Sequence, residues 1–243
     1  MSVLPTPEAT APAGLLIVGG PFGSGKTEVA IALAEQWGQT TPVTLVDLDL
    51  VTPYFRSRDV RPAELGGAVD VLAPEGEAGA SDVPVIAARL SSVLRDRERL
   101  LIVDCGGDPV GATVLAQFRS VLLTRGARVA VVLNPRRPAT QSAAATAAAV
   151  SRLLDAARVP LGGLVANGNM GVLTTPADFR AGVELATEVA ASLGTEVLFA
   201  AAPEGLLPAC APLAPHLPLL PIRRRMTSPW EGPVVARSEP RTE

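Results

Sequence analysis

The residues best suited to chemistry lie in one short stretch, Gly20-Pro-Phe-Gly-Ser-Gly-Lys-Thr27. It fits the spacing G-x-x-x-x-G-K-[ST] at every fixed position, and it contains the only lysine in a chain of 243 residues whose other basic side chains are all arginine. Glycines at these positions let backbone N–H groups turn towards phosphate oxygens. The lysine then reaches the β- and γ-phosphates and the threonine hydroxyl ligates Mg²⁺.

A lysine suits such a ring because its ammonium is a compact point charge, whereas an arginine fork is planar and longer. We therefore predict a nucleotide-binding loop that runs into a helix N-terminus. The alternative is a glycine-rich turn with an incidental exposed lysine. The residues predicted to bind nucleotide here are Gly20, Pro21, Phe22, Gly23, Ser24, Gly25, Lys26, Thr27 and Glu28.

A second candidate is the stretch LLIVDCGGD, in which four apolar residues precede Asp104 and two glycines follow it. A carboxylate at the end of a buried strand can hold a metal ion, and a nearby glycine N–H can meet the γ-phosphate. The pattern is weak by itself because many strands end in aspartate. Paired with the phosphate loop, it predicts that Asp104 and Thr27 hold Mg²⁺ and that Gly107 contacts the nucleotide.

A third candidate is VDLDLVTPYFRSRD, which follows another expected strand. We expect Asp49 to order the Mg²⁺ shell and an attacking water, with Asp47 nearby on the same face of the strand. Arg56 and Arg58 are candidates to sense the γ-phosphate or to hold an anionic partner. Tyr54, the only tyrosine, would line a pocket for an acceptor substrate. The alternative is a solvated loop with ordinary salt bridges.

Two of the three asparagines, Asn134 and Asn167, each end an expected strand. An amide offers both a donor and an acceptor, which suits the edge of a purine, although asparagine is also a common turn residue. The chain has no [NT]-K-x-D stretch of the kind that reads guanine. The sequence therefore favours adenine, with ATP and Mg²⁺ as cofactors.

Short apolar runs alternate with segments of helical spacing, which predicts an α/β fold: three α/β/α layers around a mainly parallel, twisted sheet. Thr175, Pro176 and Gly194 are expected to cap the last of these helices. The expected strands cover 15–20, 43–49, 99–107, 128–134, 161–167 and, as the last, 195–201; the expected helices cover 26–37, 82–94, 110–123, 139–157 and 175–194.

Composition divides the chain into a flexible tail over 1–13, a nucleotide-binding domain over 14–222 and a disordered tail over 223–243. A net charge of −3 argues against a general nucleic-acid binder. No apolar run reaches the length of a membrane span and the N-terminus lacks a signal-peptide pattern, so no membrane partner is expected. The two cysteines form no metal or disulfide pattern, and a cytoplasmic location is the default.

Together these motifs resemble the SIMIBI class of P-loop NTPases, which includes the MinD/ParA and CobQ/CobB groups, over roughly residues 15–202. GPFGSGKTE and VDLDLVTPYFRSRD are closer still to a bacterial and archaeal family known only as ATP-binding proteins. The resemblance implies ATP with Mg²⁺ and two switch regions, 47–59 and 104–111. The chain departs from MinD and ParA at Pro21, where those proteins carry a lysine that acts across a dimer, so a homodimer stays only a possibility.

The sequence supports three functions. The first is an ATPase whose hydrolysis drives a switch-like conformational cycle, with Lys26, Asp49 and Asp104 as catalytic residues. The second is an ATP-dependent kinase or ligase that acts on a small acid, similar to dethiobiotin synthetase. The third is a binding module that is gated by nucleotide and does not hydrolyse it. The sequence does not identify the protein or small-molecule partner.

Overall fold

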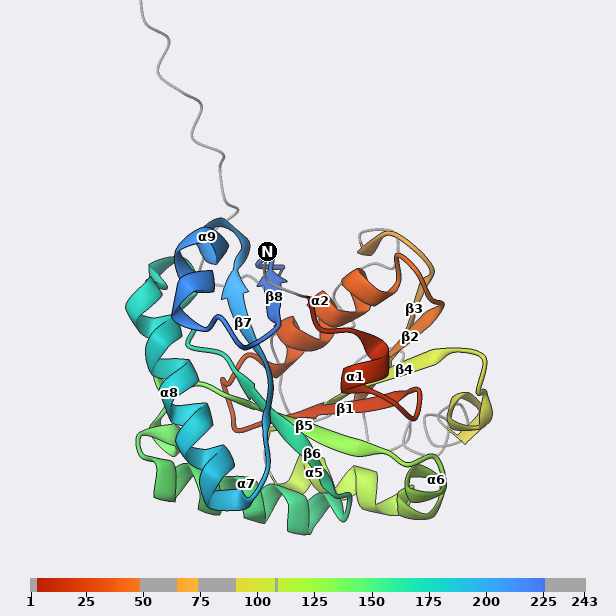
Figure 1. The fold of residues 1–243 in the computed structure, drawn as a ribbon. Coiled ribbons are helices and arrows are strands. Elements are labelled where there is room, and N and C mark those ends of the chain that lie inside the picture. Colours follow the sequence, from red (N-terminus) through yellow and green to blue (C-terminus); the bar gives the residue numbers. More distant parts are fainter. Residues whose placement is uncertain (1–3, 49–64, 74–90, 108, 226–243) are drawn as a thin grey trace, which may run out of the picture.

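A single parallel sheet of eight strands organises the molecule (Figure 1). The computed structural model describes residues 4–48, 65–73, 91–107 and 109–225. Most strands are apolar runs buried on both faces, as parallel strands between two helical layers must be. In spatial order, the strands are β3 (Val69–Leu72), β2 (Val43–Leu48), β4 (Leu100–Cys105), β1 (Leu15–Gly19), β5 (Arg128–Leu133), β6 (Leu161–Ala166), β7 (Val197–Pro203) and β8 (Leu219–Ile222).

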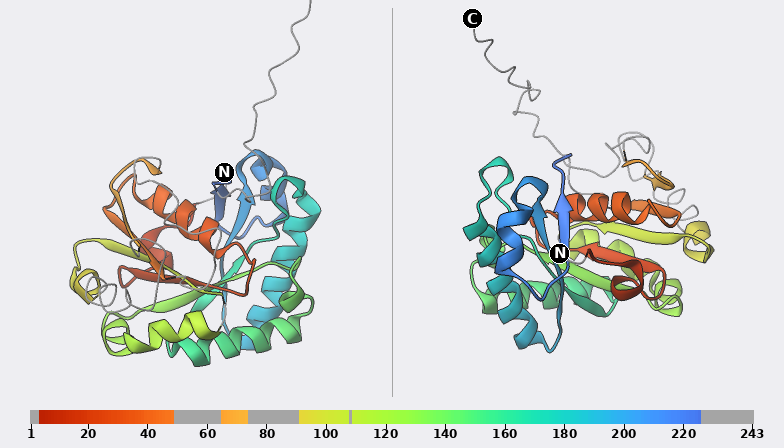
Figure 2. Two further views of the ribbon diagram at one scale, coloured as in Figure 1. Left: turned by 180° about the vertical axis from the view of Figure 1, so that it is seen from behind. Right: turned by 45° about the horizontal axis from the view of Figure 1, so that its top comes forward.

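Helices cover both faces of this sheet, which confirms the three-layer α/β/α architecture (Figures 1 and 2). On one face, α2 (Lys26–Trp37) packs its buried side chains onto a cluster that reaches from β2 to β8. The other face is covered by α5 (Pro109–Gln117), α6 (Arg119–Thr124), α7 (Ala143–Ala157) and α8 (Pro176–Leu193). Two further short helices are α1 (Pro7–Thr10) and α9 (Leu207–Cys210).

The first strand lies at the centre of the sheet, between β4 and β5. From β1 the chain fills one side of the sheet with β2, β3 and β4, and it then crosses to the other side for β5 to β8. The strand order therefore reverses beside β1. In open parallel sheets a ligand crevice forms at such a point, outside the carboxyl ends of the strands. The loop after β1 occupies that position.

The sequence placed six strands correctly but missed the two at the sheet edges. We expected 195–201 to be the last strand, and this prediction is wrong because β8 follows and pairs in parallel with β7. The sequence did not predict this strand because it contains Pro221, and proline cannot donate a backbone hydrogen bond to a neighbouring strand. Proline is tolerated mainly in edge strands, and β8 is one. The other missed strand, β3, lies at the opposite edge.

Two expected helices begin or break at different residues. The helix expected over 110–123 is divided at Phe118 into α5 and α6. The Ala-rich helix expected from 139 begins instead at Ala143, because Ser142 caps it by accepting a hydrogen bond from the Ala145 N–H. Of the helix expected over 82–94, only residues from 91 onward are described, and 91–95 are helical.

The N-terminal segment, which the sequence predicts to be a flexible tail, contacts α2 through Pro5. The carbonyl of Pro5 accepts hydrogen bonds at 2.8 Å from the Trp37 indole N–H and from the Gln36 amide. A buried indole N–H needs an acceptor, and the segment before α1 supplies it. At the other end of the chain, Arg223 and Arg225 pair with Glu35 of α2, while 226–243 lies outside the described residues. In the part of the chain that is described, no helix is long and apolar enough to cross a bilayer.

The predicted caps of α8 are confirmed. Thr175 is the N-cap, Pro176 opens the helix and Gly194 ends it in the left-handed conformation, with φ of 63°. Asp178 completes a capping box with Thr175, and its carboxylate also accepts hydrogen bonds from Arg136. The hydrogen bond from the Thr175 hydroxyl is the main cause that lowers the pKa of Asp178, and the Thr175 N–H and Arg136 add to the effect.

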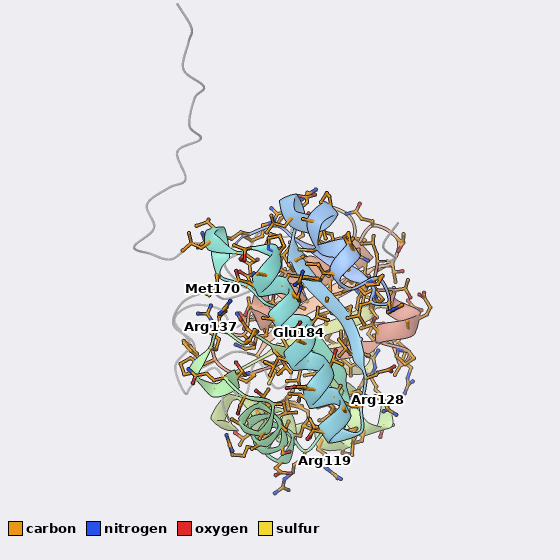
Figure 3. The ribbon with its side chains drawn as sticks, turned by 60° about the vertical axis from the view of Figure 1, so that its left-hand side comes forward. Arg119, Arg128, Arg137, Met170 and Glu184 are labelled. Carbon is orange, nitrogen blue, oxygen red and sulfur yellow. The ribbon has the colours of Figure 1, made fainter. Side chains whose placement is uncertain are left out.

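We predict that Asp178→Asn lowers the free energy of unfolding by about 1 kcal/mol at neutral pH, the usual cost of a lost cap. Because the folded state lowers the pKa of Asp178, its stabilisation is present above the ordinary pKa of 3.8 and is lost as pH falls through the folded-state pKa. Urea unfolding of both proteins from pH 7 to pH 2 should therefore converge in acid. Glu184→Gln, an exposed change on the same helix (Figure 3), should change stability little at any pH.

Candidate functional site

The loop after β1 leads directly into the buried start of α2. Gly25 precedes the helix in the left-handed conformation, with φ of 90°, and a side chain there would collide with the Asn167 amide. Lys26 and Thr27 form the first turn of α2, and each is only 6% exposed. The only lysine of the chain is therefore fixed at a helix N-terminus, where backbone N–H groups favour anions. The alternative of a glycine-rich turn with an incidental exposed lysine does not fit, because Lys26 is buried.

Asn167 holds the loop from the neighbouring part of the sheet. It follows β6, and its Nδ2 donates a buried hydrogen bond of 2.7 Å to the Ser24 carbonyl. Its own backbone N–H is bonded to the carbonyl of Leu133 at the end of β5. The Asn167 Oδ1 and Ser24 Oγ atoms are buried without a hydrogen-bond partner among the described residues. Unsatisfied buried polar atoms are rare, so this loop suits a ligand that would supply their partners.

Two carboxylates lie side by side at the carboxyl ends of β2 and β4. Asp47 and Asp104 are register partners, and they are 1% and 0% exposed. Leu45 and Ile102 lie two positions earlier on the same strands and belong to the cluster under α2. Because side chains two positions apart share a face, both carboxylates lie on the face that α2 covers. The start of α2, which carries Thr27, lies on the same face. Sequence reasoning gave Asp47 a lesser role than this position indicates.

These carboxylates and the Thr27 hydroxyl fit one of the ways in which proteins hold Mg²⁺. The described residues contain no group of three or more His, Cys, Asp and Glu side chains that would cage a metal by themselves. Mg²⁺ in nucleotide sites is bound instead through one or two carboxylates together with substrate phosphates. The donor set around Thr27 and Asp104 has that composition.

Gly107 approaches the phosphate loop closely. A Cβ on Gly107 would lie 2.8 Å from the Gly20 carbonyl oxygen and 3.1 Å from the Phe22 nitrogen. Only glycine allows this approach without a shift of backbone, so the stretch after β4 and the phosphate loop are in contact. The predicted contact of Gly107 with the nucleotide stays a prediction. Movement of either segment must then affect the other.

Asn134 and Glu28 hold backbone in this structure. Asn134 is buried; its Nδ2 donates to the Asn169 carbonyl at 2.8 Å, and its Oδ1 accepts from the Arg136 N–H at 3.0 Å. The Glu28 carboxylate accepts the Arg225 N–H at 3.1 Å, which ties the segment after β8 to the phosphate-loop helix. Direct nucleotide contacts by Asn134 and Glu28 stay predictions.

Arg137 is a member of the site that sequence reasoning missed. It is half-buried, and its Nε donates to the Gly23 carbonyl at 2.7 Å. The run LNPRRP contains the signal, because two arginines between prolines follow a strand that ends beside β1. Four predicted residues of the third stretch, Asp49, Tyr54, Arg56 and Arg58, lie outside the described residues.

A shallow pocket of about 170 Å³ adjoins the phosphate loop on the α7 side. Its wall is mainly apolar, and Phe22, 73% exposed, forms part of it. Among the described residues that line it, Arg152 on α7 has the only charged side chain. The lining residues are Pro21, Phe22, Gly107, Ala139, Ala149, Arg152 and Leu153.

Comparison with known proteins supports the fold. Scans of family models and of curated proteins found no match. Among solved structures, FtsY from Mycoplasma mycoides has a TM-score of 0.53 and 14% identity over 77% of this chain and 60% of its own. The signal recognition particle receptor FtsY from Elizabethkingia anophelis, in complex with GDP, has a TM-score of 0.52 and 16% identity over 77% of this chain and 56% of its own.

The chain thus spans less than two thirds of the length of these FtsY structures. The similarity confirms the fold that the sequence predicted, three α/β/α layers around one parallel sheet. The closer resemblance to MinD, ParA and CobQ is not confirmed.

We predict that Asn167→Asp lowers the free energy of unfolding by about 1–3 kcal/mol, because a carboxylate oxygen would replace the donor that faces the buried Ser24 carbonyl. Asn169→Asp is the matched control. The Oδ1 of Asn169 accepts from the Gly171 N–H at 2.6 Å, and an aspartate keeps that acceptor. Thermal unfolding should separate the two variants. Equal stability of both would show that the Asn167 bond does not support the loop.

Proposed function

We propose that this protein is a Mg²⁺-dependent ATPase whose hydrolysis cycle switches the conformation of the segments beside the phosphate loop. The observation that carries the proposal is that three features lie together at the carboxyl ends of the central strands. These are the buried Lys26 and Thr27 at the start of α2, the buried pair of Asp47 and Asp104, and Gly107 in contact with the loop. This is the set of parts that phosphoryl transfer from a nucleoside triphosphate requires.

Each part has a role in hydrolysis. The loop N–H groups and Lys26 would hold the β- and γ-phosphates. The Thr27 hydroxyl and Asp104 would hold Mg²⁺, which would supply positive charge to neutralise these phosphates. Asp49 orients the water. The water oxygen forms a bond to the γ-phosphorus, the bond from this phosphorus to the bridging oxygen breaks, and ADP leaves with its electron pair. The proton that the water loses goes to solvent with the phosphate.

The switch would act through Gly107. When the γ-phosphate is bound, the Gly107 N–H can donate to it, and this holds the stretch after β4 against the loop. Loss of the γ-phosphate removes the acceptor. The close approach of Gly107 to Gly20 and Phe22 supports this coupling, because a small shift on either side changes the contact.

Adenine is the proposed base because the chain lacks the guanine-reading [NT]-K-x-D stretch. One of the FtsY structures holds GDP, so ATP and GTP should be measured in parallel. The proposal requires that ATP be bound and hydrolysed faster than GTP. If GTP is bound and hydrolysed faster than ATP, the proposed base is wrong but the proposed hydrolase mechanism is unaffected.

We predict that Lys26→Ala weakens ATP binding at least 100-fold, because it removes the cation that faces the β- and γ-phosphates. Isothermal titration with ATP and Mg²⁺ measures the effect. The control is Arg180→Ala, which removes an exposed positive charge from α8. If both variants bind ATP as the wild type does, the loop is not the nucleotide site.

We further predict that Asp49→Ala keeps ATP binding within about threefold but lowers phosphate release at least 100-fold, because it removes the residue that orients the water. Phosphate release with Mg²⁺ and ATP is the measurement. Unchanged turnover in Asp49→Ala would remove this residue from the mechanism. A wild type that binds ATP without turnover would favour the nucleotide-gated binding module.

A second candidate function is ATP-dependent phosphorylation or ligation of a small acid. The observation that favours it is the pocket beside Phe22 and Gly107, in which Arg152 could pair with a carboxylate. Under this proposal, ATP consumption requires an acceptor. Phosphate or ADP release should then rise only when a fraction of small metabolites is added, and Arg152→Ala should abolish that rise.

A further inference from the structure

Arg137 and Arg136 are neighbours in the chain with different partners. The Arg136 guanidinium binds the Asp178 carboxylate, with its Nη2 at 2.6 Å from Oδ1. The Arg137 side chain turns instead to the phosphate loop, where its Nε donates to the Gly23 carbonyl at 2.7 Å. A Cβ on Gly23 would lie 3.0 Å from the Arg137 Nε and 3.2 Å from its Cδ. Arg137 therefore lies directly against the loop.

The backbone of Arg137 is fixed before any ligand arrives. Its N–H donates to the Asn134 carbonyl at 3.2 Å, and its carbonyl accepts from the Thr140 N–H at 3.0 Å. Pro138 follows it, and Arg137 has the extended conformation, with φ of −117° and ψ of 146°, that a residue before proline favours. The backbone therefore loses little conformational entropy when the Arg137 side chain binds a partner.

Besides this fixed position, Arg137 has N–H donors that are not used within the described part of the chain. A guanidinium has five N–H donors, and only the Nε donor is used by Gly23. Among the described residues, no ion pair or hydrogen bond involves its two Nη groups. Figure 3 places Arg137 at the same end of the molecule as Met170, which follows β6, and away from Arg128, which begins β5. Its charge thus lies at the carboxyl edge, where the phosphate loop lies.

We infer that Arg137 is an arginine finger built into the same chain: Nε stays on the Gly23 carbonyl, and the Nη groups contact the phosphate oxygens as charge develops on them during transfer. This inference rests on the proposed function and deepens it. A finger stabilises transition-state charge and contributes little to ground-state binding. The chain would then need no cation from a second molecule at this loop, where Lys26 is the only lysine.

The test compares Arg137→Ala, Arg137→Lys and Arg119→Ala in the full chain. Arg119 is an exposed arginine of α6, so its removal controls for net charge. We expect Arg137→Ala to lower the turnover number for ATP at least 100-fold, with the dissociation constant for ATP changed less than threefold. Arg137→Lys should recover part of the loss, because a lysine keeps the charge but not the fork. Arg119→Ala should behave as wild type.

A purely structural role of Arg137 predicts a different result. If Arg137 only supports the loop, Arg137→Ala should weaken ATP binding and lower the unfolding temperature, and any loss of turnover should disappear at saturating ATP. That pattern overturns the inference. So does a turnover number in Arg137→Ala that is within threefold of wild type.

Binding of ADP with aluminium fluoride separates this inference from the proposed function. The inference expects the wild type to bind this transition-state analogue at least 100-fold more tightly than Arg137→Ala does, while both bind ADP alone equally. A wild type that binds ATP but releases no phosphate overturns the hydrolase proposal. In that case, equal affinity of the two proteins for the analogue overturns the finger as well, and unequal affinity supports it.

Discussion

A loop that turns its N–H groups inward to hold phosphate must turn carbonyls outward, and those carbonyls need partners. The hydrogen bond from Asn167 to the Ser24 carbonyl meets this need in the buried interior, and the bond from Arg137 meets it for the preceding carbonyl, that of Gly23. Both donors are side chains from the segments that follow β5 and β6, the two strands next to β1 on one side of the sheet. The shape of the phosphate loop is therefore set from outside, by residues more than a hundred positions away in the chain.

The sheet makes this support possible. Because all eight strands are parallel, the segments after β1, β5 and β6 leave the sheet at one edge, and side chains with little reach can meet there. The opposite side of β1 supplies the carboxylates, since β4 lies beside it and β2 beside β4. Hydrogen-bond donors, Asn167 and Arg137, thus lie on one side of the loop, and the carboxylates of Asp47 and Asp104 lie on the other. This separation of charge suits a phosphate that carries a cation.

The sequence was informative where local pattern decides structure. The glycines and lysine of the loop, the apolar runs of the central strands and the caps of α8 are all local signals, and the structure places them as predicted. It failed where tertiary packing decides. The edge strand β8 was missed because it contains Pro221. The hydrogen bond from the Trp37 indole to Pro5 holds a segment that composition alone predicts to be flexible. The hydrogen-bond partners of the Asn134 and Arg137 side chains lie in loops that only the fold brings close. Local pattern therefore located the phosphate loop in the chain, whereas the contacts that support the loop depend on the fold.

The place of β1 between β4 and β5 also has a consequence for how the protein is made. Of the eight strands, β1 is synthesised first, and the strands that flank it in the sheet, β4 and β5, are synthesised only after β2 and β3. Until then the nascent chain carries an apolar strand without neighbours, and contacts of this long sequence separation form slowly. Such strands are prone to aggregate while they wait. The topology that gathers the phosphate loop's supports thus leaves β1 without its neighbours for a longer stretch of synthesis than β2 or β3.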